Sequence, residues 1–307
     1  MLGIAYAASI GGIGTLIGTP PNIVLAGTAR ELLGIEVSFV RWMLIGLPIA
    51  IIGLFSTWFY LSRIAYKLGK TTIPGGLNVV RNELHNLGPM SRAEWSVLAI
   101  FGCVALAWIV RPWWITPFLP NVDDAVIAVT GAVALFVVPL SLHQNQFLLD
   151  WDTAKKLPWG IVLLFGGGLA IASAFRSSGL SDWMGEALTG LGGLPALVVL
   201  LTVVTMVIFL TEITSNTASA TMLMPVMAAL AVGLAVDPLL LMVPAALAAS
   251  CAFMLPVATP PNAIVFGSGC VTIPQMMKAG FWLNIGSIIL ITLIGYVLLP
   301  VVWGLGG

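Results

Sequence analysis

The sequence predicts an all-α membrane protein, and three observations indicate this class. Hydrophobic residues make up 59% of the 307 residues and charged residues only 8%, whereas a soluble domain carries roughly 25% charged residues. Mean hydropathy is +1.07. Several apolar stretches approach or exceed the about 20 residues that a spanning helix requires. Because the formal net charge is zero and basic residues form no run, we expect no nucleic-acid partner.

Two kinds of apolar stretch follow one another along the chain. The full-length candidates for spanning helices are residues 42–61, 95–110, 122–142, 159–175 and 281–303. Two further stretches are interrupted: residues 2–17 end at Gly18-Thr19-Pro20-Pro21, and residues 239–257 end at Ala258-Thr259-Pro260-Pro261. Proline lacks a backbone N–H and disfavours helix in the residue before it. We therefore expect a broken helix at each place.

The two interruptions are copies of one sequence motif. Ala7-Ala8-Ser9 precedes Thr19-Pro20-Pro21-Asn22, and Ala248-Ala249-Ser250 precedes Thr259-Pro260-Pro261-Asn262, with the two prolines 240 positions apart. Paired helix breaks in corresponding places of two halves are typical of the substrate site of a secondary transporter. The repeat thus predicts a binding site that is built from both copies.

A third motif, Thr214-Ser215-Asn216-Thr217, lies between two apolar arms. Residues at about 194–236 are expected to form a re-entrant helical hairpin with its polar tip buried at mid-membrane. At that depth, irregular backbone is tolerated only where it is packed within the protein or lines a water-filled cavity. The alternative is two ordinary helices with a polar turn at the surface. Hydropathy alone leaves both open, and the repeat favours the hairpin.

The positions of Lys and Arg predict the orientation, because cytoplasmic loops carry the excess of these residues. Three loops on one side hold eight of the twelve basic residues: Arg63, Lys67, Lys70, Arg81, Arg92, Lys155, Lys156 and Lys278. This side is predicted to be cytoplasmic and the C-terminus to lie outside. An odd number of crossings then separates the two copies, which predicts an inverted repeat.

The repeat also predicts the domain organisation. Residues 1–69 are expected to end the first inverted repeat, and residues 70–94 to form a cytoplasmic linker between the repeats. Residues 95–307 are expected to form the second repeat, with a broken helix at about 239–269 and a last helix at 281–303.

The motifs offer groups for a cation and an anion side by side. Hydroxyls, an Asn carbonyl and unwound backbone carbonyls suit sodium, and the freed N–H groups at the start of a half-helix suit a carboxylate. Neither interrupted stretch contains Lys or Arg, so helix ends and bound cations must supply the positive charge. Glu212 is the one acid in an apolar stretch near a motif. It is expected to orient the hairpin tip, to contact a cation, or to have a structural role in which it is hydrogen-bonded to nearby backbone.

These motifs together carry a resemblance to a known family. The stretches that carry it are Thr211-Glu212-Ile213-Thr214-Ser215-Asn216-Thr217, Ala248 through Asn262, and Ser9 through Asn22. Over essentially the whole chain the sequence resembles the divalent anion/sodium symporter family, which includes sodium-coupled dicarboxylate and citrate carriers.

The resemblance implies sodium-coupled symport of di- or tricarboxylates such as succinate, by a multi-pass protein of the inner or plasma membrane that is not an enzyme. It also implies a homodimer in which a mobile transport domain moves against a scaffold as an elevator. By resemblance, the substrate-binding residues are Ser215, Asn216, Thr217, Thr259, Pro260, Thr19 and Pro20. By the same resemblance, the sodium ligands are Thr211, Ser215, Asn216, Ala258 and Asn262 at one site, and Ser9, Gly12, Gly18 and Asn22 at the other.

One family motif has no counterpart here. The family carries an earlier Ser-Asn-Thr, and because Ser215 precedes Ser250 by 35 residues, its counterpart should precede Ser9 by as many. The comparison of the two halves leads us to expect that roughly 145 residues precede this chain, which is then the C-terminal two-thirds of a carrier.

Other functions stay open at this point. The motifs are compatible with a proton-coupled carrier or an anion exchanger of the same fold, and with a non-transporting fragment that packs against a partner. An intramembrane enzyme is disfavoured, because the sequence has no metal-ligand helix motif and no Gly-x-Ser-x-Gly, and His85 and His143 lie in or near expected loops.

Overall fold

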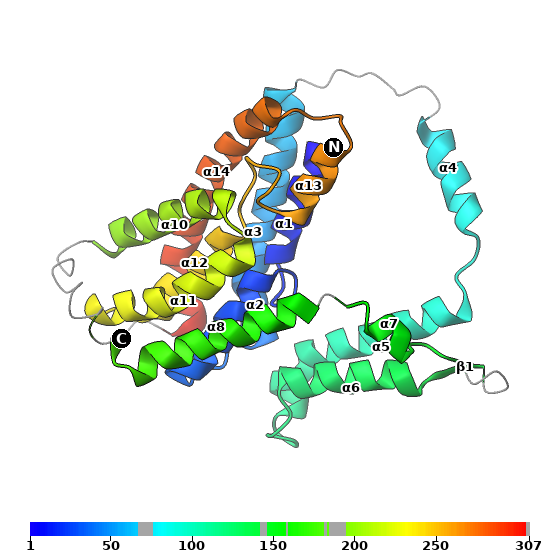
Figure 1. The fold of residues 1–307 in the computed structure, drawn as a ribbon, viewed down its shortest axis with the longest axis horizontal. Coiled ribbons are helices and arrows are strands. Elements are labelled where there is room, and N and C mark those ends of the chain that lie inside the picture. The colour runs from blue at the N-terminus through cyan, green and yellow to red at the C-terminus, as the bar shows by residue number, and fades with distance from the viewer. Residues whose placement is uncertain (67–75, 142–145, 158, 181–182, 184–194, 305–307) are drawn as a thin grey trace. The chain divides into compact units, whose positions relative to one another are not determined.

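The computed structural model describes residues 1–66, 76–141, 146–157, 159–180, 183 and 195–304. The described chain is mostly helical (Figure 1), which confirms the predicted helical class. Within the described residues, five helices are long and apolar enough to cross a membrane: Phe39–Ala65, Arg92–Ile115, Ala196–Ile213, Asn216–Gly233 and Ile273–Trp303.

The chain divides into two compact units by its internal contacts. Unit 1 combines Met1–Lys67 with Gly160–Gly307, and unit 2 is Leu68–Trp159. This division is a different one from the predicted division into repeats, because unit 1 takes residues from both repeats.

Unit 1 holds both broken helices and the predicted hairpin. Its helices are α1 (Leu2–Ile13), α2 (Pro20–Leu33), α3 (Phe39–Phe59) with the π-helical turn η1 (Tyr60–Ala65), α8 (Trp159–Ser177), α10 (Ala196–Ile213), α11 (Asn216–Gly233), α12 (Leu239–Ala249), α13 (Pro260–Gly267) and α14 (Ile273–Trp303). Helix α2 runs farther than the sequence suggests and includes Arg30 in its last turn. The prediction that neither broken helix contains a basic residue is therefore wrong for α2.

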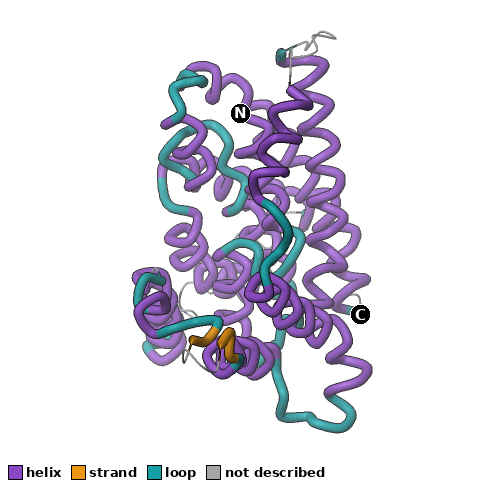
Figure 2. Tube along the Cα trace, turned by 90° about the vertical axis from the view of Figure 1, so that its right-hand side faces the viewer, coloured by secondary structure: helices purple, strands orange, loops and turns teal. Residues whose placement is uncertain are grey.

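Unit 2 consists of α4 (Gly76–Leu87), α5 (Arg92–Val110) with the turn η2 (Arg111–Ile115), α6 (Asp124–Val137), β1 (Pro139–Ser141), β2 (Gln146–Phe147) and α7 (Trp151–Ala154). The two strands pair antiparallel, a short departure from the all-α prediction that Figure 2 shows in orange. In addition, the expected linker of residues 70–94 contains the helix α4. His85 lies on α4 rather than in a loop, and His143 lies outside the described residues.

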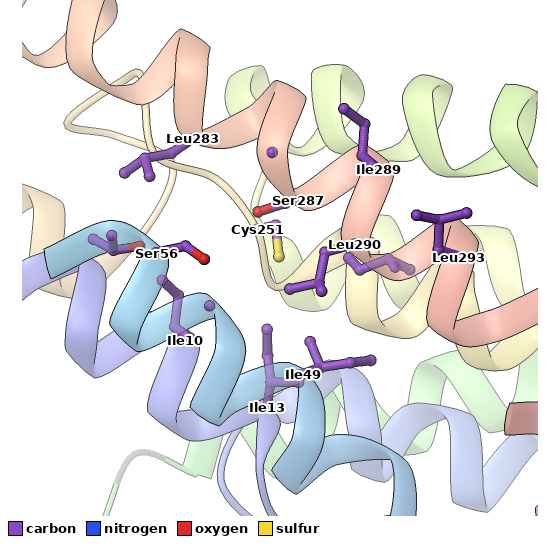
Figure 3. A pocket seen from close by; sticks show the side chains of 14 residues that line it. Ile10, Ile13, Ile49, Ser56, Cys251, Leu283, Ser287, Ile289, Leu290 and Leu293 are labelled. Atoms are coloured by element: carbon purple, nitrogen blue, oxygen red, sulfur yellow. The ribbon is translucent and has the colours of Figure 1, made fainter. Parts of the chain in front are cut away.

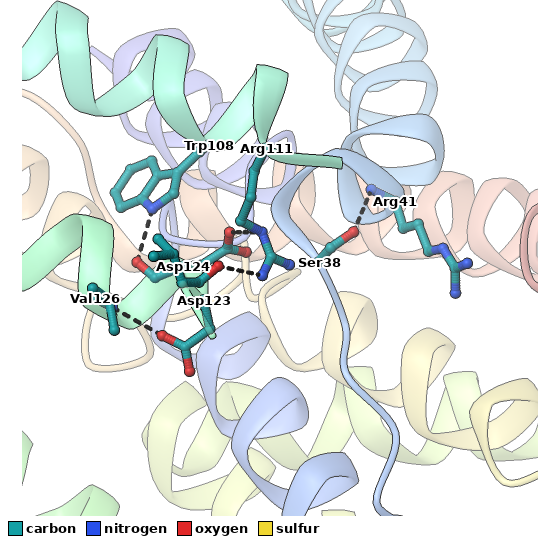
Figure 4. Close-up of polar contacts among 8 residues, drawn as sticks. Ser38, Arg41, Trp108, Arg111, Asp123, Asp124 and Val126 are labelled. Carbon is teal, nitrogen blue, oxygen red and sulfur yellow. Dashed lines mark hydrogen bonds and ion pairs between the residues drawn. The ribbon is translucent and has the colours of Figure 1, made fainter. Parts of the chain in front are cut away.

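A partly buried ion pair lies in unit 2. The Arg111 guanidinium lies 2.8 Å from the Asp124 carboxylate at the start of α6, and the Trp108 indole N–H donates to the Asp124 carbonyl over 2.9 Å (Figure 4). These contacts tie the end of α5 to the start of α6.

Two predicted helix boundaries shift for local reasons. The helix expected at 122–142 ends at Val137, because Pro139 favours extended backbone at Val138, whose ψ is 117°. The helix expected at 281–303 begins at Ile273 instead, because Thr272 and Gln275 form a capping box that starts it eight residues earlier.

Helix α12 lies at the centre of unit 1. It contacts α2, α10, α11 and α14, and each residue described on it except Leu240 is buried. Its second half is rich in alanine, which lets neighbouring helices approach closely in a membrane protein. Figure 1 shows α12 beside α11 and α14. The loop that follows α12 therefore starts from a densely packed position.

Candidate functional site

The first break separates α1 from α2. Thr19 has extended backbone at φ −147°, and Pro20 and Pro21 occupy the first helical positions of α2. The Asn22 side chain is fully buried. Its Nδ2 donates to the Thr15 carbonyl over 2.8 Å and, more weakly, to the Gly12 carbonyl over 3.5 Å. Asn22 thereby holds the loop against the end of α1.

Gly12 and Gly18 meet at this break because neither has a side chain. A Cβ at Gly12 would lie 2.7 Å from the Gly18 carbonyl oxygen, and a Cβ at Gly18 would clash with the Gly12 carbonyl oxygen. Such a distance is not compatible with any side chain. The two glycines therefore permit the close approach of two backbone segments.

The second break, between α12 and α13, has the same construction. Thr259 is extended at φ −138°, and its hydroxyl accepts from the Asn262 backbone N–H over 3.3 Å. The Asn262 side chain is fully buried, and its Nδ2 donates to the Ala252 carbonyl over 3.0 Å and to the Leu255 carbonyl over 3.1 Å.

The two asparagines match in hydrogen bonding as well as in sequence. Each donates to carbonyls ten and seven residues earlier in the chain. Each also leaves its own carbonyl oxygen, Oδ1, buried without a hydrogen-bond donor among the described residues. A buried acceptor without a donor is costly, so each break presents an oxygen that suits a cation.

The tip of the α10–α11 hairpin lies at the second break. The Thr211 hydroxyl lies 2.7 Å from Asn216 Oδ1 and 3.1 Å from the Ala249 carbonyl oxygen, and donates toward both. Helix α12 packs against both arms of the hairpin, which Figure 1 shows in lime and yellow. The hairpin tip and the end of α12 are thus one cluster.

The first break joins the same cluster. The Ser250 hydroxyl at the end of α12 donates to the Thr19 hydroxyl over 3.3 Å, although the two residues are 231 positions apart. The N-terminal ends of α2 and α11 therefore both lie at the C-terminal end of α12. Two positive helix ends thus meet the negative ends of α10 and α12 there.

The helices of the two copies pair crosswise. Helix α13 contacts α1, and α12 contacts α2, and Figure 1 shows α13 beside the N-terminal end of α1. The leading arm of each break thus lies beside the trailing arm of the other. Each leading arm also packs on the long helix that follows its own break, α1 on α3 and α12 on α14.

Glu212 has a clear set of partners that sequence reasoning did not find. Its buried carboxylate accepts from the backbone N–H groups of Phe253, Met254 and Leu255 over 2.7 to 3.0 Å. The Asn284 side chain on α14 donates to it over 2.8 Å. Of the expectations for Glu212, these contacts fit the structural role, in which it is hydrogen-bonded to backbone.

Two further residues were missed, although the sequence carries a signal for one. Trp42-x-x-Ile45-Gly46 recurs as Trp282-x-x-Ile285-Gly286, at the same spacing of 240. The Trp42 indole N–H donates to the Ile13 carbonyl over 2.9 Å and so holds the end of α1, whereas Trp282 is 58% exposed. Asn284 has no counterpart signal, because Leu44 stands at the matching position.

The remaining predicted residues fall into two groups. Thr259, Ala258, Thr211 and both asparagines are buried at the breaks, and Gly12, Gly18 and Thr19 lie in the first one. Ser215 and Pro260 are exposed, and Thr217 and Pro20 half-buried. Ser9 is half-buried on α1, and its side chain makes none of these contacts.

A separate cavity of about 240 Å³ lies between α1, α3, α14 and the start of the second loop (Figure 3). Most of its lining is aliphatic, with Ser56, Thr57, Ser287 and Cys251 as its polar members. None of the predicted site residues lines it. The candidate site is therefore the polar cluster at the breaks.

Comparison with known proteins adds independent findings. The profile of the family described as Sodium:sulfate symporter transmembrane region matches residues 1–304. The chain is 48% identical over 308 residues to the sodium-dependent dicarboxylate transporter SdcS of Staphylococcus saprophyticus subsp. saprophyticus, and 46% identical over 311 residues to SdcS of Staphylococcus aureus strain USA300. These alignments cover 99% of this chain and 59% of each relative, so the chain spans about three-fifths of their length.

Proposed function

This chain belongs to the sodium:sulfate symporter family, and we propose that the protein carries dicarboxylates across the membrane together with sodium ions. The names of its relatives support this proposal. The observation that carries it is the pair of matched helix breaks, each with a buried asparagine whose Oδ1 has no donor among the described residues.

Sodium ions are assigned to these oxygens. Neutral oxygens from carboxamides, hydroxyls and backbone carbonyls suit a hard cation. The described residues contain no group of three His, Cys, Asp or Glu side chains that suits a transition metal. One sodium site takes Asn22 with Ser9, Gly12 and Gly18, and the other takes Asn262 with Thr211, Ser215, Asn216 and Ala258.

The substrate carboxylates are assigned to the helix N-termini beside the sodium sites. Helices α2 and α11 begin beside the end of α12, through the contacts of Thr19 and Asn216. The freed N–H groups at the start of α11 attract an anion. At α2, where Pro20 and Pro21 have no N–H, the positive end of the helix dipole does so. Thr19, Pro20, Ser215, Asn216 and Thr217 would bind one end of the substrate, with Thr259 and Pro260 at the start of α13.

The crosswise pairing of the broken helices supports an inverted repeat. A two-fold axis that exchanges α1 with α12 and α2 with α13 converts the α1–α13 contact into the α12–α2 contact, and in an inverted repeat this axis lies in the membrane plane. The hairpin of α10 and α11 is then re-entrant, with its tip at the second break.

The division into two compact units supports an elevator, in which unit 1, holding both breaks, moves relative to unit 2. The homodimer and the outside C-terminus rest on the family resemblance and on the distribution of Lys and Arg. A C-terminal tag that is cleaved only by protease added outside intact cells would support this orientation, and cleavage only in inverted vesicles would reject it.

The test is uptake of radiolabelled succinate by the full-length protein in liposomes. An inward sodium gradient should drive uptake, and replacement of sodium by choline should abolish it. Equal uptake in choline with an inward proton gradient would favour the proton-coupled alternative. Uptake that depends only on internal succinate, without any cation gradient, would favour exchange.

A further inference from the structure

Glu212 lies where a carboxylate is costly unless it is fully bonded. Its side chain is 3% exposed, in the last turn of α10. Five hydrogen bonds reach its two oxygens, four from three consecutive backbone N–H groups and one from Asn284. Successive N–H groups that converge on one anion form a nest, which compensates the charge without a cationic side chain.

The same loop is held from its other side. Asn262 donates to the Ala252 and Leu255 carbonyls. Glu212 therefore accepts from backbone N–H groups of the loop, and Asn262 donates to its backbone carbonyls. Gly280 on α14 completes the enclosure, since a Cβ there would clash with the Phe253 carbonyl. Gly280 and Asn284 are four residues apart, and both therefore face the loop from one side of α14.

Glu212 also connects the loop to the hairpin tip. Its neighbour Thr211 contacts the Ala249 carbonyl before the loop and Asn216 at the tip. Two adjacent residues of α10 thus hold the entrance and the middle of the loop. The directions of the remaining loop carbonyls depend on both.

We infer that Glu212 is a positioning residue for sodium binding: its carboxylate sets the backbone of residues 251–258, and Asn284 holds that carboxylate in place. This inference rests on the proposed function. Glu212 itself does not coordinate sodium, because both of its oxygens are engaged by N–H donors. It instead keeps the carbonyls of the second break in the arrangement that sodium requires.

Glutamine is the informative replacement. In E212Q one oxygen remains an acceptor and the other position becomes an NH₂ donor, which opposes the N–H groups of Met254 and Leu255. We expect E212Q to raise the half-saturating sodium concentration for succinate uptake by about tenfold, equivalent to ~1.4 kcal/mol. The succinate uptake rate at saturating sodium should change less. E212D keeps the charge and should recover part of the sodium affinity, and E83Q, an exposed acid on α4, is the matched control.

Labelling of Cys251 gives a readout that does not require transport. Cys251 starts the loop and is 2% exposed, and Cys103 and Cys270 are replaced by serine in all variants. N-Ethylmaleimide should modify Cys251 faster in E212Q than in the otherwise identical protein with Glu212, and saturating sodium should slow this modification again.

The outcomes separate the two proposals. If the protein with Glu212 shows no sodium-dependent uptake, the proposed function fails, while unchanged Cys251 labelling in E212Q would overturn the positioning role. If uptake is sodium-dependent but E212Q changes the half-saturating sodium concentration less than twofold, the inference is wrong. Should E212Q fail to fold, N284L replaces it, because N284L removes one donor to Glu212 and leaves the hydrogen bonds from the loop in place. N284L should raise the half-saturating sodium concentration about threefold. No change in that concentration would count equally against the inference.

Discussion

The Ser250 hydroxyl donates to the Thr19 hydroxyl over 3.3 Å, and this contact joins the two broken helices directly. The two residues belong to different copies of the repeated sequence motif. A change at one break can therefore reach the other through a single hydrogen bond.

S250A and T19V should each lower the free energy of unfolding. The double variant should lower it by less than the sum of the two single effects. One hydrogen bond contributes about 0.5–1.5 kcal/mol, so the double-mutant cycle should give a coupling energy within this range. Thermal unfolding in detergent measures it. S268A combined with T19V is the control, because the Ser268 hydroxyl donates to the Val265 carbonyl and accepts from the Cys270 N–H, both within three residues, and additive effects are expected. Additivity for Ser250 and Thr19 would show that the contact contributes nothing.

The glycines of α1 allow a comparison of neighbours. G12A places a methyl group against the Gly18 carbonyl, whereas a Cβ at Gly11 has nothing within 4 Å. Overpacking of this kind costs about 1–3 kcal/mol, and the first break must move to relieve it. We expect G12A to lower sodium-driven succinate uptake at least about tenfold. G11A should be neutral or slightly stabilising, and equal loss in both variants would refute the steric argument.

Asn22 and Asn262 should be equally sensitive to substitution. N22A or N262A leaves two backbone carbonyls without the Asn donor, at about 1–3 kcal/mol for each buried unsatisfied group, and removes the Oδ1 oxygen. The half-saturating sodium concentration should rise more than about tenfold in either variant. Asn82, exposed on α4, supplies the control N82A. An effect confined to one of the two buried asparagines would contradict the functional equivalence of the breaks.

Helix α14 offers a second glycine pair. A Cβ at Gly280 would clash with the Phe253 carbonyl, and a Cβ at Gly286 on the same helix meets nothing within 4 Å. G280A should therefore displace the second loop and reduce the thermal unfolding midpoint. G286A should leave this midpoint unchanged or raise it. Reduced sodium affinity in G280A but not in G286A would link the loop to the second sodium site.

The ion pair of Arg111 and Asp124 should contribute to stability and not to transport chemistry. Arg111 and Asp124 have side chains that are 9% and 22% exposed, so R111M removes the guanidinium from a partly buried carboxylate, at a cost of about 1–3 kcal/mol. The exposed pair of Lys155 and Asp152, at 56% and 84%, gives the control K155A. Its removal should change the unfolding free energy by less than about 0.5 kcal/mol. Equal effects of R111M and K155A would contradict this assignment.

Local sequence signals predicted the breaks well. Helices α2 and α13 each begin at a proline, and the threonine before each proline has extended backbone. Both features follow from steric limits that act within a few residues, so they can be predicted from the sequence alone. The exact ends of α6 and α14 depended on Pro139 and on the Thr272 capping box. Both signals are local and were present in the sequence, but hydropathy gives them no weight.

The sequence by itself determined the membrane class, the two helix breaks and the residue types that they present, because hydropathy and proline sterics act over short distances. Tertiary structure alone decided the roles of Glu212 and Asn284, the contact of Ser250 with Thr19 and the crosswise pairing of the broken helices. It also decided that Trp42 is buried and bonded while Trp282, in the same repeated pattern, is exposed. These contacts join residues that lie far apart in the chain, and such partners are selected by the packing of whole helices rather than by neighbouring residues.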